Sequence, residues 1–100
     1  MIYFTQLIYL KPGQEKVFDE FEAVAMPLIA RYQGDLILRM RPPVSSMIEG
    51  SGNPPYEIHV VSFPGEAEFQ GFAKDPERAS FLHLKEASVE RIVLIRGSVI

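Results

Sequence analysis

The amino-acid sequence predicts an α+β fold in which short strands alternate with amphipathic helices. Two observations support this fold class. Short runs rich in Ile, Val, Tyr and Phe alternate with segments in which apolar residues recur every three or four positions. Pro and Gly mark most of the boundaries between these segments. The length of 100 residues suits one domain, so we expect residues 1–100 to fold as a single unit.

The first strand is predicted over residues 2–10 and is followed by a helix over residues 14–33. Acidic side chains gather in the N-terminal half of this helix, as the helix macrodipole favours. Gly34 stands where a left-handed C-terminal cap is expected, and Pro27 predicts a kink over residues 23–26. One face of the helix is apolar and includes Val17, Phe21, Val24 and Leu28.

Two further strands are predicted over residues 35–41 and 56–63. Residues 42–55, which join them, are rich in Pro, Gly and Ser and show neither helical nor strand periodicity. We therefore expect this segment to form a flexible loop.

The second strand alternates apolar and other side chains along its length. Leu36, Leu38 and Met40 share one side. We expect this apolar side to face the helices, which would direct Arg39 and Arg41 away from them.

The C-terminal half begins with a helix predicted over residues 66–74 and ends with a strand over residues 90–98. Between them, Asp75-Pro76 breaks the helical region and starts a second piece, because Asp is a favourable N-cap and Pro suits the first helical position. The complete order, strand–helix–strand–strand–helix–strand, is typical of a ferredoxin-like βαββαβ fold. In that fold an antiparallel sheet carries its helices on one face.

The first and last strands are apolar on both of their sides. Two helices cover only one face of a sheet, so the second face would expose an apolar surface of a size that usually marks an interface. A second copy of the same chain would cover it by symmetry, and we therefore expect a homodimer. The alternative is a monomer whose central strands tolerate apolar residues on the solvent side. The residues concerned are Tyr3, Phe4, Leu7, Ile8, Ile92, Val93, Leu94 and Ile95.

Composition excludes several classes of function. The net charge of −3 and the pI of about 5.3 argue against nucleic-acid binding. The absence of Cys excludes disulfides, thiolate metal sites and Cys nucleophiles. With only two His, an all-protein zinc site would need carboxylates, and we expect neither a metal nor a cofactor. No apolar run approaches a membrane span and no signal peptide is recognised, so we expect a cytoplasmic protein without membrane contact.

The candidate site is a group of charged residues on neighbouring strands. Arg39 and Arg41 share one side of the second strand, and Glu57 and His59 share one side of the third. We expect them to line the space between the two sheets of a dimer, joined by Arg96. There the Arg residues would bind an anionic or carbonyl-bearing small molecule, and His59 would act as a general base.

Two alternatives to this site remain open. The charged group would equally suit a structural salt-bridge cluster on the sheet. A shift of one residue in strand register would instead place Glu57 and His59 on the helix side.

Three stretches carry a resemblance to a known family. They are YQGDLILR, EIHVVSFPGEAEFQGFAKDPERASFLHLKEAS and VERIVLIRG, and together they resemble the dimeric α+β barrel superfamily. The chain is most similar to a small bacterial family of unknown function that neighbours the antibiotic-biosynthesis monooxygenase-like group. The matching features are Gly34, the basic Arg39, Phe63-Pro64, Asp75-Pro76 and Gly97.

The resemblance implies a dimeric α/β barrel, but it does not imply one chemistry. The superfamily includes cofactor-free monooxygenases, isomerases, haem-degrading enzymes and proteins without known activity, and a shared fold does not decide among them. The haem-degrading members rely on a Trp or Asn in specific places. Here Trp is absent and the only Asn is Asn53 in the loop, which argues against haem chemistry.

We compare three hypotheses for the function of this protein. The first is a dimeric protein that binds a small organic molecule without established catalysis. The alternative is a cofactor-independent monooxygenase or isomerase acting on a small aromatic or carbonyl compound. The third, RNA binding, shares the βαββαβ order, but the strand YEIHVVSF lacks the basic and aromatic pattern of RNA-recognition motifs.

Overall fold

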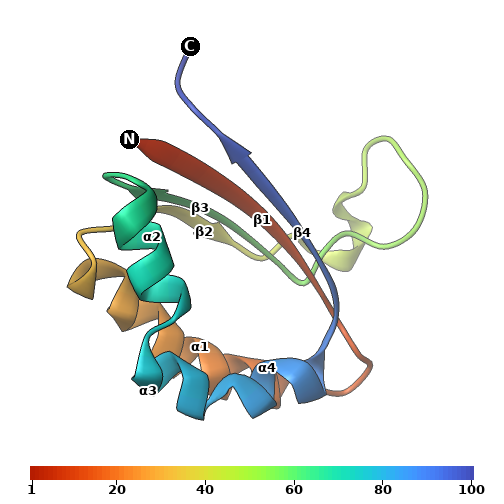
Figure 1. The fold of residues 1–100 in the computed structure, drawn as a ribbon. Coiled ribbons are helices and arrows are strands. Elements are labelled where there is room, and N and C mark those ends of the chain that lie inside the picture. Colours follow the sequence, from red (N-terminus) through yellow and green to blue (C-terminus); the bar gives the residue numbers. More distant parts are fainter.

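A computed structural model describes residues 1–100 as an antiparallel sheet with helices on one face (Figure 1). The sheet order is β2-β3-β1-β4, which places the first and third strands in the centre. This arrangement confirms the predicted ferredoxin-like α+β fold. The strands are β1 (Ile2–Leu10), β2 (Asp35–Met40), β3 (Glu57–Phe63) and β4 (Val89–Gly97).

The helices form a single layer on the inner face of the sheet (Figure 1). The predicted second helical region is divided twice, at the expected Asp75-Pro76 and again at Phe81. Residues 42–55 contain only the short 3-10 helix η1 (Val44–Ser46). None of the helices has the length and apolar content required to span a lipid bilayer. The helices are α1 (Glu15–Arg31), α2 (Glu66–Ala73), α3 (Pro76–Ser80) and α4 (Leu82–Ser88).

Asp75 caps α3 as predicted and also ties it to α1. Its Oδ1 accepts hydrogen bonds from the backbone N–H groups of Glu77 and Arg78, at 2.8 and 3.1 Å. Its Oδ2 accepts from the hydroxyl of Tyr32 and from Arg31. These donors, with the Tyr32 hydroxyl first among them, lower the pKa of Asp75 to about 2. The helical break is therefore anchored to the end of α1.

The end of α1 differs from the prediction. The residue in the left-handed conformation is Gln33, with φ of 59°, and not Gly34. The N–H of Gln33 donates to the carbonyl of Ala30 and that of Gly34 to the carbonyl of Ile29, which is a Schellman motif displaced by one residue. Gly34 is needed for a different reason, because the chain passes against Phe63 with no space for a side chain.

β2 contains an irregularity that reverses its alternation. Leu36 pairs with Val61, but Leu38 pairs with Val60, so Ile37 is an extra residue in the ladder. Beyond this bulge, Arg39 lies opposite His59. The prediction that Leu38 and Met40 face the helices and that Arg39 and Arg41 point away is therefore wrong, because one inserted residue exchanges the two sides of a strand.

The apolar core is divided into two clusters beneath the sheet. One contains Phe4, Ile29, Val61 and Phe63. The other contains Ile8, Phe18, Phe21 and Ala25. The centre of the inner face separates them, and there the side chains of Gln6 and His59 lie opposite each other on β1 and β3.

The outer face of the sheet is mostly apolar and carries no helix, although Thr5, Ser62 and Arg91 also lie on it. The strand register places on it Leu7, Leu38, Met40, Ile58, Val60, Val93 and Ile95. Leu38 and Ile95 remain 44% and 54% exposed. The second apolar face expected from the sequence is therefore present, and we call these residues the outer apolar face.

Replacing Gly34 by Ala should destabilise the fold. The new Cβ would lie 2.6 Å from Cε1 of Phe63 and 2.9 Å from the carbonyl oxygen of Ile29, so the end of α1 must shift. We expect a loss of ~1–3 kcal/mol in urea unfolding, as for other overpacked sites. Gly97→Ala is the control, since nothing lies within 4 Å of its added Cβ. Equal stability of the two variants would contradict this account.

Candidate functional site

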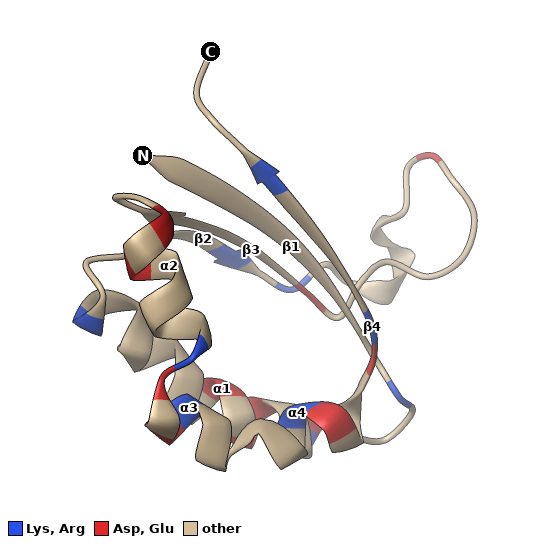
Figure 2. Ribbon diagram, viewed as in Figure 1, with Lys and Arg blue, Asp and Glu red and all other residues tan.

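Glu57, the first residue of β3, is fully buried on the inner face of the sheet. Its Oε1 accepts hydrogen bonds from Nε of Arg41 at 2.7 Å and from Nη2 of Arg39 at 3.2 Å. Nε of Arg39 also lies 3.2 Å from its Oε2. Arg39 of β2 and Arg41, which follows the end of this strand, thus meet the acidic residue that opens β3 (Figure 2). The structure therefore brings three of the predicted site residues together, but on the helix side.

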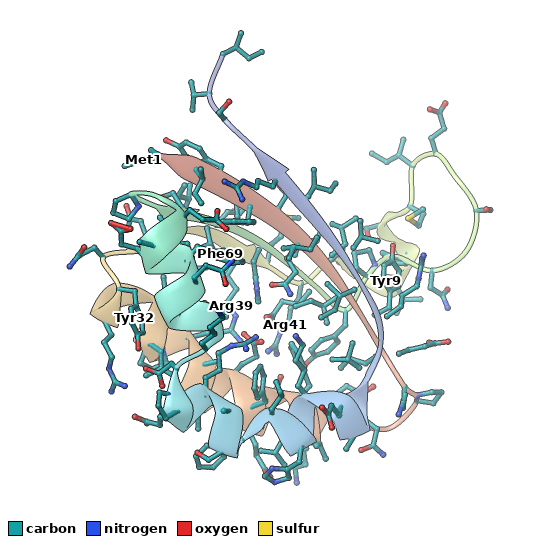
Figure 3. The ribbon with its side chains drawn as sticks, in the orientation of Figure 1. Met1, Tyr9, Tyr32, Arg39, Arg41 and Phe69 are labelled. Carbon is teal, nitrogen blue, oxygen red and sulfur yellow. The ribbon has the colours of Figure 1, made fainter.

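The two Arg side chains point into the space between the sheet and the helices (Figure 3). Arg41 also reaches α1, where its Nη2 donates to Oδ1 of Asp19 at 2.8 Å. The same Oδ1 accepts a hydrogen bond from the hydroxyl of Tyr56, and the guanidinium lies over the Tyr56 ring. These contacts join the segment after β2 to α1 and close one end of the site.

The environment keeps Glu57 ionised. Burial alone would raise its pKa, but hydrogen bonds from His59, Arg41 and Arg39 outweigh this effect and lower the pKa to about 2. At neutral pH this carboxylate is therefore a fixed negative charge and can only accept hydrogen bonds.

His59 follows two residues later and is also buried. Its Nε2 makes a hydrogen bond with Oε2 of Glu57. Because an ionised carboxylate cannot donate, Nε2 must carry the proton of this hydrogen bond. Its Nδ1 is buried and has no hydrogen-bond partner. In a neutral imidazole, this hydrogen bond selects the tautomer with the proton on Nε2, in which Nδ1 is the hydrogen-bond acceptor.

Glu22 of α1 completes the site and was not predicted. Its Oε2 lies 3.7 Å from Nε2 of His59 and has no hydrogen-bond partner. Burial raises its pKa to about 7, and the charge of Glu57 adds to this effect. The sequence held a signal for it: Glu22 falls at helical spacing within the buried stripe of Phe18, Phe21, Ala25 and Ile29. A carboxylate inside such a stripe must be buried.

A cavity of about 240 Å³ lies between the sheet and the helices beside His59. Its walls are mostly apolar, and its polar members are Gln6, His59, Arg78 and Lys85. A smaller cavity of about 40 Å³ continues toward Glu22 and shares Gln6, Arg78 and Lys85 with the first. The remaining walls of the larger cavity are Phe4, Met26, Ile29, Val61, Phe63, Phe69, Phe72, Ala73 and Leu94.

Arg96, the last of the predicted ligand-binding residues, lies outside this group. It shares the inner face, opposite Phe4, but its Nη1 pairs with Glu66 of α2 at 2.6 Å. Its guanidinium carbon is 6.0 Å from the centre of the Phe4 ring. It therefore joins β4 to α2 at the far end of the sheet.

Glu22, Glu57 and His59 place one donor atom each within 4.8 Å of one another, a separation that a metal ion could bridge. Both oxygens of Glu57, however, already face guanidinium groups. A dication would have to displace these contacts and lie close to Arg39 and Arg41. These three residues therefore fit charge pairing within the protein better than they fit a metal site.

No family model and no curated protein matches this sequence. Solved structures do match. A protein of unknown function from Rhodopseudomonas palustris is 18% identical with a TM-score of 0.84, covering 99% of this chain and 82% of the other. A dimeric ferredoxin-like protein of unknown function from Jannaschia sp. is 18% identical with a TM-score of 0.72 and 98% coverage of both chains.

A third match is a dabb family protein with a ferredoxin-like fold from Mesorhizobium loti. It is 16% identical with a TM-score of 0.66, covering 99% of this chain and 96% of the other. Likeness at this level of identity shows the ferredoxin-like fold, which the predicted dimeric α+β barrel superfamily also has. The predicted neighbourhood of the monooxygenase-like group stays a prediction.

Glu22→Gln should make the protein more stable at high pH. The pKa of Glu22 is raised from 4.5 to about 7, so the folded state binds this proton more tightly than the unfolded state does. The stability that protonated Glu22 contributes to the folded state is fully present below about pH 4.5 and is lost as the pH rises through 7. We expect the free energy of unfolding of the variant to exceed that of the wild type by up to about 3 kcal/mol at pH 8.

The comparison is made by urea unfolding from pH 4.5 to pH 8, so that the pH slopes of the two proteins are measured directly. The control is Glu20→Gln, which changes an exposed carboxylate on the same helix and should leave the slope unaltered. Parallel curves for Glu22→Gln and the wild type would show that Glu22 carries no raised pKa.

Proposed function

We propose that this protein binds a small organic molecule in the cavity beside His59 and that it does so as a homodimer. The observation that carries the binding proposal is the cavity itself, which has a mostly apolar wall and a few converging polar side chains. Its volume of about 240 Å³ suits a molecule with one or two rings. The groups that would fix the orientation of the molecule are His59, Gln6, Arg78 and Lys85.

The homodimer proposal rests on the outer apolar face. A surface of this kind usually marks an interface, and a second copy of the sheet would cover it with the same residues. The solved neighbours support it, because the one from Jannaschia sp. is described as dimeric. The binding cavity lies on the opposite face, so association would leave its lining unchanged.

Leu38→Glu and Ile95→Glu should each break the dimer. Both side chains lie on the outer apolar face and are exposed in a single chain, so the substitutions leave the core intact. Each would bring two like charges into a symmetric interface. Multi-angle light scattering should give twice 11.3 kDa for the wild type and 11.3 kDa for the variants.

The control for this experiment is Ala87→Glu, which adds the same charge at an exposed position on α4 and should remain dimeric. A wild-type mass of 11.3 kDa at micromolar concentration would exclude the dimer.

A second candidate function is general-base catalysis, and the Glu57–His59 hydrogen bond favours it. With its proton on Nε2, His59 would accept a proton at Nδ1 from a carbon next to a carbonyl group. The electrons of that C–H bond would form the carbon–carbon double bond of an enolate, and the carbonyl electrons would move to oxygen. Return of the proton to another atom gives an isomer. The same deprotonation would precede reaction with O2 in a cofactor-independent monooxygenase.

His59→Gln should abolish proton abstraction if the site is catalytic. The assay follows the exchange of the α protons of 2-tetralone with D2O by NMR. We expect the wild type to accelerate exchange and the variant to lose about 10²-fold or more, as general bases contribute this much. Glu57→Gln should also lose activity, because the amide no longer selects the tautomer. His83→Gln, at the exposed His of α4, is the control.

Equal exchange rates for the wild type and His59→Gln would rule out His59 as a general base. That result would leave the binding proposal intact.

A further inference from the structure

Two of the ten Lys and Arg residues differ from the others in their surroundings. Arg78 of α3 and Lys85 of α4 are partly buried, whereas every other basic side chain is exposed. Neither makes a salt bridge, although four of the exposed Arg residues do. Both line the large cavity and the small one, so they lie where the two spaces meet.

Arg78 has most of its hydrogen-bonding capacity unused. Its Nη1 donates to the carbonyl of Ala73 at 3.3 Å, while its Nε is buried without any partner. Its guanidinium lies 5.2 Å from the centre of the Phe72 ring and 5.7 Å from that of Phe21. The rings hold the planar group in place, and its remaining N–H groups are free for an acceptor.

No carboxylate forms a salt bridge with either member of this pair. The charge of Glu22 raises the pKa of both Arg78 and Lys85. Burial, however, keeps this carboxyl group partly protonated at neutral pH. The charge of the exposed Glu86 also raises the pKa of Lys85, but by less than the charge of Glu22 does. Burial lowers the pKa of both Arg78 and Lys85, and the charge of Arg78 lowers the pKa of Lys85 further. Two unbalanced cations in a mostly apolar cavity carry a cost that an anion would relieve.

The other end of the large cavity is aromatic. Phe4 stacks on Phe69 with ring centres 4.2 Å apart, and Phe63 contacts both Phe69 and Phe72. Aromatic walls of this kind favour a flat apolar body. The cavity therefore has a cationic end and an aromatic end, with Gln6 and His59 between them on the sheet.

We propose that the cavity selects an aromatic carboxylate, with the carboxylate held between Arg78 and Lys85 and the ring packed against the Phe side chains. A carboxylate matches the fork of Arg78 through paired hydrogen bonds. The proposal rests on the small-molecule binding described above and names the chemical class that it favours. It would also place the ring of the ligand beside His59.

The test uses three naphthalene probes of similar shape and different charge: 1-naphthoate, 1-naphthalenemethanol and 1-naphthylmethylamine. Binding to the full-length protein is measured by isothermal titration calorimetry near neutral pH. We expect naphthoate to bind roughly 10- to 100-fold more tightly than the neutral alcohol, which is the range for charge-assisted hydrogen bonds. The ammonium probe should bind weakest, because it adds a third cation.

Arg78→Gln and Lys85→Gln should each reduce the preference for naphthoate while the alcohol still binds. Binding of the alcohol also shows that each variant has kept its folded cavity. Arg78→Lys should retain part of the preference, since the charge remains. Lys74→Gln removes an exposed cation between α2 and α3 and is the matched control.

The outcomes separate this proposal from the one on which it rests. Equal affinity for naphthoate and the alcohol, or an unchanged preference in both Gln variants, would overturn the selection of a carboxylate and leave small-molecule binding in place. Failure of all three probes to bind would overturn small-molecule binding itself.

Discussion

The buried carboxylate of Glu57 is the constraint around which the site is organised. A charge removed from water is costly unless it is paired and hydrogen-bonded, and Glu57 has three donors from Arg39, Arg41 and His59. Two of these donors reach it only because the bulge at Ile37 turns the second half of β2 over. The irregular strand and the buried acid therefore depend on each other. Removing either would leave charged groups inside the protein without partners.

The inner face of the sheet carries both packed apolar side chains and polar side chains, and the two kinds occupy different positions along the strands. Apolar clusters around Phe4 and Ile8 lie on either side of a central polar zone that contains Gln6, His59 and Glu22. Packing of the two clusters holds the sheet and helices together, and a cavity lined by Gln6, His59 and the Phe4 cluster remains between the two layers. Departures from an apolar core are expected at functional sites, because stability elsewhere compensates for them.

The two faces of the sheet differ in chemical character. The sequence suggested that the charged residues and the association surface share one face, but the structure places Glu57, His59, Arg39 and Arg41 on the helix side. The outer face is mostly apolar, with Thr5, Ser62 and Arg91 among its polar members. A binding site in each protomer and a symmetric interface on the opposite side are therefore compatible, and neither has to be altered to accommodate the other.

The sequence by itself determined the element order, the ferredoxin-like fold, the helical break at Asp75-Pro76 and the second apolar face. These features depend on local periodicity, capping and composition, which the chain displays directly. It also identified Glu57, His59, Arg39 and Arg41 as one group. Only the tertiary structure decided which face they occupy, because a single bulge at Ile37 reverses the alternation without leaving a clear mark in the sequence. Only the tertiary structure joined Glu22, Arg78 and Lys85 to the site, because contacts between distant helices and strands depend on packing in three dimensions.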